Sequence, residues 1–313
     1  MMNGARIDVG MTATSTATAA YYASLQYANE RPQGRRIESN GRKNPNQEPA
    51  LIIEHADVRR MLLKQKSIVE GALSLLLETA KYVDLALEGE GDVKKDSHLL
   101  LELLTPMAKT FPAERGKEAI DNGLQVLGGY GFCTDFILQQ YYRDVRIMSL
   151  YEGTTGIQSL DLLGRKITME NGRALQLLMA KMTETMQEAS TYDDLKPYVK
   201  QLEAKLGDVQ KVLSRLIPMA MAGDYESFLA DATIFMDMAS TVVVAYQWIK
   251  MATAAKKALV TGNGTLETSF YESKIHTMKY YFKYELPRVN ACMDTLMNEE
   301  ELTIVQEKQE VFR

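Results

Sequence analysis

The sequence predicts an all-α protein, and three observations support this fold class. Of the 313 residues, 46% are hydrophobic, which is enough apolar material for a sizeable core. Long stretches are rich in Ala, Leu, Met, Glu, Gln and Lys, which are good helix formers. Short alternating runs of Val, Ile and Thr bounded by turns, which are typical of strands, are nearly absent.

The first half of the chain predicts helices separated by segments rich in Gly and Pro. A helix of small residues is expected from about Asn3 to Asn29, followed by an exposed polar loop that reaches Pro49. A second helix is expected from His55 or Asp57 to about Leu87. Two more helices are predicted, one that ends before Pro112 and one that begins near it, because proline is tolerated in the first turn of a helix. The second of these helices stops at Gly128-Gly129.

The second half continues the helical pattern. A short helix is expected from Phe136 to about Ile147, and a longer one begins after Gly153 with a threonine as N-cap and ends before Gly172. Residues 173–297 predict four more helices without obvious chemistry, which we interpret as a separate bundle. The predicted domains are therefore residues 1–166 and residues 167–313.

Charge and composition exclude several classes of protein. The net charge of −5 gives no basic footprint for nucleic acid. Cys133 and Cys292 fit neither a disulfide framework nor a zinc pattern, and we interpret them as reduced thiols of a cytoplasmic protein. The three histidines lie outside any Glu-x-x-His repeat, so no metal site is predicted. The longest apolar run, near Ala239–Ile249, is too short to span a membrane, and no signal peptide is predicted.

Candidate functional residues gather between residues 125 and 154. Gly128 and Gly129 would let a ligand approach the backbone closely at a helix end. Glu152 lies on a short turn between two helices, where its carboxylate can point into a cleft. Thr154 places a hydroxyl near a helix N-terminus, which favours a phosphate or another polar ligand group. Taken singly, each feature is more often structural, since Glu favours helix starts and Gly-Gly is a common stop signal.

The order and spacing of these motifs are more specific than any one of them. Gln-x-x-Gly-Gly-x-Gly begins at Gln125, Tyr-Tyr-Arg-Asp follows at 141–144, and Tyr-Glu-Gly-Thr at 151–154. Upstream, Tyr-Ala-Asn-Glu-Arg-Pro-Gln occupies residues 27–33. Arg6 lies 31 − 6 = 25 residues before Arg31. Over about residues 1–166, this series resembles the C-terminal half of FAD-dependent acyl-CoA dehydrogenases.

The resemblance implies an activity and a set of site residues. Glu152 matches the base that removes the α-proton of an acyl-CoA thioester, while FAD accepts the β-hydrogen as hydride and a trans-2-enoyl-CoA forms. Substrate contacts are implied for four residues: Asn3, Arg6, Tyr151 and Gly153. Contacts to FAD are implied within the same subunit for Thr154 and across a subunit interface for five residues: Arg31, Gln33, Gln125, Gly128 and Gly129. The implied partners are further copies of the chain, as a dimer or tetramer, and electron-transfer flavoprotein.

Two departures from the family pattern affect this comparison. Gly34 and Arg35 follow Gln33 where many relatives have Phe-Gly, so an aromatic contact to the flavin is missing or supplied elsewhere. The longer loop at 37–50 and the bundle at 173–297 resemble large members with a C-terminal helical extension. One candidate subgroup is the methylthiopropanoyl-CoA dehydrogenase-like members.

The N-terminal helical domain and middle β-domain of the family have no counterpart in the sequence pattern. We therefore expect a C-terminal portion of the enzyme, with little or no turnover alone. The alternative is a non-catalytic helical module for oligomerisation or partner binding, which would bind neither CoA esters nor flavin.

Overall fold

The described part of this computed structural model comprises residues 2–300 and 302–304. Within it, helices form the regular structure and no strand occurs, apart from two isolated antiparallel bridges in the loop after the first helix. This confirms the all-α prediction. The last residues of the predicted second domain, 305–313, lie outside the described residues, as does residue 301.

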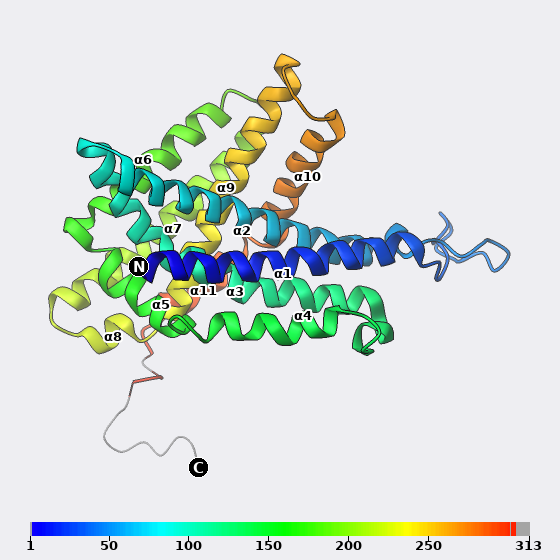
Figure 1. Cartoon of the computed structure of the whole chain (residues 1–313), viewed down its shortest axis with the longest axis horizontal. Helices are drawn as coiled ribbons and strands as arrows, with labels where there is room; N and C mark the ends of the chain where they lie inside the picture. Colours follow the sequence, from blue (N-terminus) through cyan, green and yellow to red (C-terminus); the bar gives the residue numbers. More distant parts are fainter. Residues whose placement is uncertain (1, 301, 305–313) are drawn as a thin grey trace, which may run out of the picture.

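Three long helices build the first part of the chain and lie side by side (Figure 1). They are α1 (Met2–Glu30), α2 (Ala56–Glu88) and α3 (Gly91–Leu127). The buried face of α1 consists mainly of small residues, which let its backbone approach its neighbours closely: Gly10, Ala13, Ala17, Ala20, Ser24 and Ala28. The short helix α4 (Leu138–Val145) packs against α1 and α3.

The predicted break at Pro112 is wrong, because α3 continues through both Pro106 and Pro112. Proline at position 112 removes the N–H that would bond the carbonyl of Ala108, four residues earlier. Gly10 of α1 packs directly on that carbonyl, and a Cβ at Gly10 would lie 2.2 Å from the Ala108 oxygen. Tertiary packing against α1 and α2 therefore sustains a helix that local propensity would interrupt.

Gly10→Ala is expected to destabilise the protein by about 1–3 kcal/mol, because the new methyl group would overlap backbone atoms that cannot rotate away. Gly4→Ala is the matched control in the same helix, since a Cβ there meets nothing within 4 Å. The control should be neutral or slightly stabilising, as Ala favours helix over Gly. Urea unfolding of both variants measures the difference, and equal midpoints would contradict this account.

Beyond residue 154 the structure alternates short helices with long ones. The helix predicted to end before Gly172 consists of α5 (Thr155–Asp161) and a π-helical turn η4 (Leu162–Lys166). The backbone leaves the helical conformation at residues 170–172, near the start of α6, so the predicted end is confirmed. The later described helices are α6 (Met169–Ala189), α7 (Lys196–Met221), α8 (Tyr225–Leu229), α9 (Ala232–Thr261), α10 (Thr268–Tyr284) and α11 (Arg288–Leu296). Two short helices, α8 and α11, add to the four predicted over 173–297; they begin after Asp224, whose side chain caps α8, and after Pro287.

The long apolar helix α9 is the centre of the second part. It contacts α6, α7, α10 and α11 of the second part as well as α2, α3 and α5 of the first part. The helix is longer than the apolar run noted in the sequence and is long and apolar enough to cross a membrane. However, 83% of its most apolar window is buried within the protein, as expected for a core helix. One continuous cluster of buried side chains therefore extends through both predicted domains.

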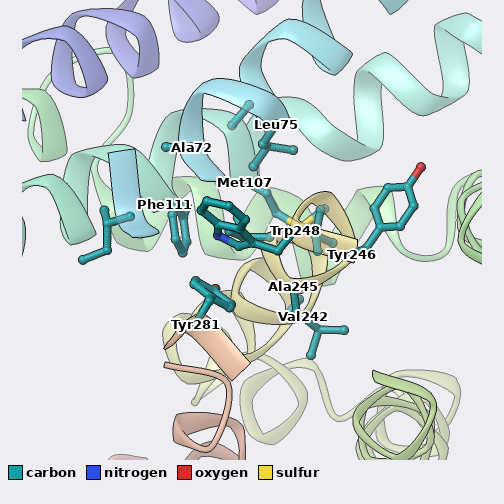
Figure 2. Packing of buried hydrophobic residues seen from close by; sticks show 14 of the residues in the cluster. Ala72, Leu75, Met107, Phe111, Val242, Ala245, Tyr246, Trp248 and Tyr281 are labelled. Atoms are coloured by element: carbon teal, nitrogen blue, oxygen red, sulfur yellow. The ribbon is translucent and has the colours of Figure 1, made fainter. Parts of the chain in front are cut away.

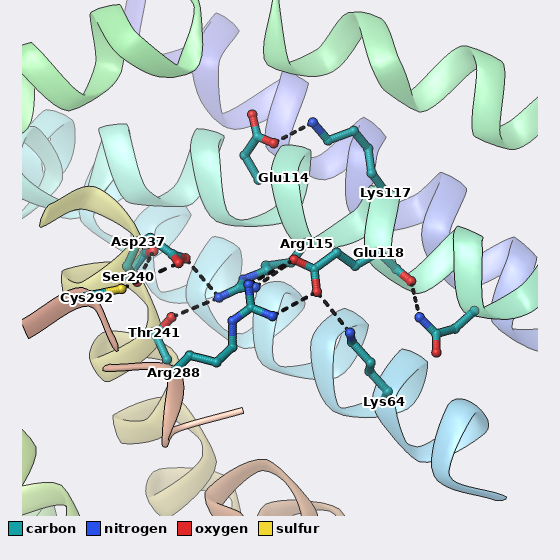
Figure 3. Close-up of polar contacts among 11 residues, drawn as sticks. Lys64, Glu114, Arg115, Lys117, Glu118, Asp237, Ser240, Thr241, Arg288 and Cys292 are labelled. Carbon is teal, nitrogen blue, oxygen red and sulfur yellow. Dashed lines mark hydrogen bonds and ion pairs between the residues drawn. The ribbon is translucent and has the colours of Figure 1, made fainter. Parts of the chain in front are cut away.

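An ion network joins the two parts of the chain (Figure 3). Arg115 of α3 is buried and donates to Glu118 at 2.7 Å and to Asp237 of α9 at 2.9 Å. Arg288 of α11 and Lys64 of α2 contact the same Glu118 carboxylate at 3.2 and 3.0 Å. Burial raises the pKa of Glu118, but the three surrounding cations outweigh burial and lower the pKa from 4.5 to about 2.

Glu118→Gln is expected to lower the free energy of unfolding at pH 7 by about 1–3 kcal/mol. The depressed pKa means that the carboxylate contributes fully above pH 4.5 and loses this contribution as the pH falls toward 2. The gap between wild type and Glu118→Gln should therefore narrow between pH 7 and pH 3 in urea unfolding. Glu203→Gln, at an exposed position on α7, is the control. A gap that is independent of pH would contradict the assignment.

Candidate functional site

The predicted base lies on a turn with an unusual backbone. This turn joins a 3-10 segment, η3 (Arg146–Ser149), to α5. Glu152 has φ of 56° and Gly153 has φ of 87°, so two successive residues adopt the left-handed conformation. A residue with a Cβ rarely adopts this conformation unless its surroundings hold it there. Thr154 then caps α5, because its Oγ1 accepts the N–H of Ile157 at 3.3 Å, which confirms the predicted N-cap.

Two buried side chains donate to the carbonyls of this turn. The Nε2 of Gln158 donates to the carbonyl of Glu152 at 3.0 Å, and the Nζ of Lys109 donates to the carbonyl of Gly153 at 2.7 Å. Both donors are fully buried. They come from different helices, α5 and α3, so the turn is fixed to the body of the fold. Glu152 itself is half-buried.

The predicted substrate residues of α1 lie near the same end of the fold. The Nη1 of Arg6 pairs with Asp161 of α5 at 3.2 Å, while its buried Nε has no hydrogen-bond partner within the described residues. The amide of Asn3 donates to Glu102 of α3, which also pairs with Lys166. The structure therefore places Arg6 beside α5, which follows the turn, and Asn3 beside α3, and each side chain already contacts a carboxylate.

The other predicted residues of this turn, Tyr151 and Gly153, differ in their surroundings. Tyr151 is exposed, and its hydroxyl donates to the sulfur of Met148 at 3.2 Å. Gly153 could not carry a side chain, because a Cβ would lie 2.6 Å from the Nε2 of Gln158. Along the turn, the half-buried Glu152 therefore lies between an exposed tyrosine and a glycine that no other residue can replace without a shift of Gln158.

A second group of predicted residues lies at the far end of α1 and α3. Gly128 ends α3 with φ of 60°, and a Cβ added at Gly128 or at Gly129 would meet no atom within 4 Å, so both are open to a ligand. The guanidinium of Arg31 lies 5.6 Å from the centroid of the Tyr130 ring, and its buried Nε has no hydrogen-bond partner in the described part. Gln125 is exposed at the last turn of α3.

Gln33 belongs to the same end through the loop that follows α1. Its N–H donates to the carbonyl of Ala50 at 2.9 Å, and its carbonyl accepts from the Nε2 of His55 at 2.7 Å. The backbone of Gln33 is thus fixed, while its side chain is exposed.

These two groups do not meet within one copy of the chain. Arg6 and Arg31 lie near opposite ends of α1, which is continuous between them (Figure 1). At 1.5 Å per residue, the 25 intervening steps separate them by roughly 37 Å. One protomer therefore presents a base at one end and a separate open polar surface at the other.

Sequence reasoning missed Lys109 and Gln158. Lys109 is the single charged residue in the apolar run 103–113 of α3, and an isolated cation in a buried helix is a signal that could have identified it. Gln158 carries no comparable signal, because a glutamine in the first turns of a helix is ordinary. Its role becomes visible only when α5 folds back over the turn.

Comparison with known proteins assigns the fold. Residues 42–167 match the model of the acyl-CoA dehydrogenase C-terminal domain, and residues 178–305 match a model described as acetyl-CoA dehydrogenase C-terminal like. The chain is 31% identical over 294 residues to 3-methylmercaptopropionyl-CoA dehydrogenase of Ruegeria pomeroyi. It is 32% identical over 302 residues to a broad-specificity linear acyl-CoA dehydrogenase of Mycobacterium tuberculosis.

The chain belongs to the acyl-CoA dehydrogenase family.

The alignments with these two acyl-CoA dehydrogenases each cover 93% of this chain but only 48% and 49% of the relatives. The chain thus spans about half the length of the relatives it matches. Solved structures show the same fold. A Caenorhabditis elegans protein in complex with C11-CoA has a TM-score of 0.70 at 20% identity, covering 96% of this chain and 48% of that chain. An acyl-CoA dehydrogenase complexed with FAD from Bacillus anthracis has a TM-score of 0.68 at 18% identity, covering 94% and 48%.

Proposed function

We propose that this chain supplies the catalytic base and part of the FAD and acyl-CoA sites of an acyl-CoA dehydrogenase. The observation that carries the proposal is Glu152 on a left-handed turn whose two carbonyls are held by Lys109 and Gln158. Such a turn fixes a half-buried carboxylate at the surface of a rigid helical body. A general base requires this kind of fixed placement relative to the proton it accepts.

The proposed reaction removes one hydrogen from each of two neighbouring carbons of an acyl-CoA thioester. The carboxylate of Glu152 accepts the α-proton, and the electron pair left at the α-carbon forms the new double bond as the β-hydrogen departs with its electrons. Bound FAD supplies the acceptor for that hydride. The product is a trans-2-enoyl-CoA, and Arg6, Asn3, Tyr151 and Gly153 are proposed to orient the substrate beside Glu152.

The residues at the far end of α1 and α3 fit FAD as a cofactor. The buried unpaired Nε of Arg31 and the open backbone at Gly128 and Gly129 suit an anionic, hydrogen-bonding ligand. Because this end lies roughly 37 Å from the Arg6 end by helix length, we propose that it contacts the FAD of a neighbouring copy. Gln33 and Gln125 would contribute to the same surface, and Thr154 would contact the FAD bound to its own subunit.

A homo-oligomer, either a dimer or a tetramer, follows from this arrangement. Exposed large hydrophobic side chains are frequent between residues 130 and 160, where an interface would cover them. They are Tyr130, Phe132, Ile137, Tyr142, Ile147, Leu150, Tyr151, Ile157 and Leu160. Phe132 is the most exposed of them, at 92%.

A reduced flavin must pass its electrons onward, and we propose electron-transfer flavoprotein as the acceptor. A cytoplasmic location is supported by the two free thiols, Cys133 and Cys292. Because the chain spans about half of its relatives, we propose that the rest of the flavin site lies in the half that these residues do not match. The chain alone should then show little turnover.

The test mixes the flavin-loaded enzyme that contains this chain with a panel of acyl-CoA substrates. Reduction of the bound flavin is measured as bleaching of the absorption band of oxidised flavin. Bleaching with a trans-2-enoyl-CoA product supports the proposed dehydrogenase, and the panel identifies the acyl chain. If this chain contacts neither flavin nor CoA esters in that enzyme, the result would instead support the alternative of a non-catalytic helical module.

A further inference from the structure

The turn that carries Glu152 is fixed by hydrogen bonds from two buried side chains, one of which is charged. Glu152 and Gly153 expose two successive carbonyls toward the helical body, and each carbonyl meets one buried donor. The left-handed backbone at Glu152 is strained for a residue with a Cβ, so it persists only while its surroundings favour it. The two donors, Gln158 and Lys109, are therefore the contacts that oppose relaxation of the turn.

Lys109 is an unusual residue for this position. Its side chain is fully buried, and its hydrogen bond goes to the neutral carbonyl of Gly153 at 2.7 Å. Lys166, the other buried lysine near this end of the fold, pairs with the carboxylate of Glu102. Burying an ammonium group is costly, and an ion pair is the usual compensation. A buried lysine that holds a main-chain carbonyl is thus poorly explained by stability alone.

The charges around Lys109 come from three elements. Lys109 interacts electrostatically with Glu114 of α3, with Arg6 of α1 and with Glu152 of the turn. Burial lowers the pKa of Lys109 to about 8; Glu114 and Glu152 oppose this shift, and Arg6 adds to it. The ammonium therefore interacts with both the backbone of the turn and the carboxylate that the turn presents.

We infer that Lys109 is a positioning residue for Glu152, which it serves by fixing the carbonyl of Gly153 while Gln158 fixes the carbonyl of Glu152. This inference rests on the proposed function of Glu152 as the base. Lys109 touches neither substrate nor flavin in this role. It acts through the turn, by restricting where the carboxylate can lie relative to the α-proton.

The experiment compares Lys109→Met with Lys166→Met, which removes a second buried ammonium away from the turn. Hydrogen–deuterium exchange of the amides in residues 151–158 is measured on chain 1–313 without added flavin or substrate. Lys109→Met should accelerate exchange in this segment by about tenfold, as expected for one lost hydrogen bond. Lys166→Met should leave exchange there unchanged. Equal exchange in Lys109→Met and wild type would overturn the inference.

Two further variants keep the test decisive if Lys109→Met fails to fold. Lys109→Arg retains a cationic donor and should restore slow exchange, whereas Gln158→Met removes the other donor and should accelerate exchange in the same segment. Slow exchange in a folded Gln158→Met would count against the two-donor arrangement. In the flavin-loaded enzyme, Lys109→Met should lower kcat with little change in KM, because the carboxylate and not the substrate is misplaced.

The exchange result does not depend on what Glu152 does. If Lys109→Met loosens the turn but Glu152→Gln retains full activity, the proposed function fails while the structural role of Lys109 stands. If Glu152→Gln is inactive but Lys109→Met exchanges and reacts like wild type, the positioning role fails while the base assignment stands.

Discussion

Glu152→Gln is expected to lower the rate of flavin reduction by about 10²–10⁴-fold in the flavin-loaded enzyme that contains this chain, the range typical of a lost general base. Glutamine preserves the size of the side chain and the backbone of the turn, but its amide cannot accept the α-proton. Stopped-flow bleaching of the flavin with an acyl-CoA substrate measures the loss. The variant should retain bound FAD, because the replaced group is not assigned to cofactor binding.

Glu170→Gln is the matched control for this experiment. Glu170 is an exposed glutamate with φ of 47°, so it shares the left-handed backbone of Glu152 but lies beyond α5 and η4. Its replacement should leave flavin reduction unchanged. If Glu152→Gln and wild type reduce flavin at the same rate, Glu152 is not the base, and the left-handed turn has a structural role only.

Trp248→Ala is expected to lower the free energy of unfolding by about 3–5 kcal/mol, the range for removing a buried tryptophan. Figure 2 shows its ring beside Phe111 of α3 and Tyr281 of α10, at the contact between the two parts of the chain. The indole is fully buried, and its Nε1 donates to the carbonyl of Ser67 at 3.0 Å. Gly71 leaves the space that the indole fills, since a Cβ there would lie 2.8 Å from Nε1.

Trp248→Phe separates the two contributions of this residue. Phenylalanine keeps most of the apolar contact but cannot donate to Ser67, so the loss should be smaller, about 1–2 kcal/mol. Guanidinium unfolding monitored by circular dichroism gives both values, which avoids relying on the fluorescence of the replaced tryptophan. A loss below about 1 kcal/mol for Trp248→Ala would show that the contact between α9 and α2 relaxes to fill the cavity.

Most of the helical content could be predicted from the sequence because it depends on local patterns. The stop at Gly128 and the cap at Thr154 are local signals, and the structure has both. The continuity of α3 through Pro112 could not be predicted, because it depends on Gly10 from a helix roughly 100 residues away in the chain. The short helices α8 and α11 were also missed, because only four helices were predicted over residues 173–297.

The candidate site likewise combines features that follow from local sequence motifs with features that depend on tertiary packing. Glu152 is recognisable from a contiguous motif, whereas Lys109 lies 43 residues upstream and meets the turn only through tertiary packing. The ion network around Glu118 is similar, since its cations come from α2, α3 and α11. Sequence motifs therefore predicted the groups proposed to act on a ligand, and the structure was needed to find the groups that hold them in place.

The continuity of α1 has a mechanical consequence. Because one uninterrupted helix has Arg6 near its first turn and Arg31 directly after its last residue, it behaves as a stiff rod that links the two proposed ligand-binding surfaces. A tilt of about five degrees around one end would displace the other by roughly 3 Å, given the rise of 1.5 Å per residue. The small-residue face that packs α1 against α3 thus limits that tilt, and the alignment of one surface constrains the alignment of the other.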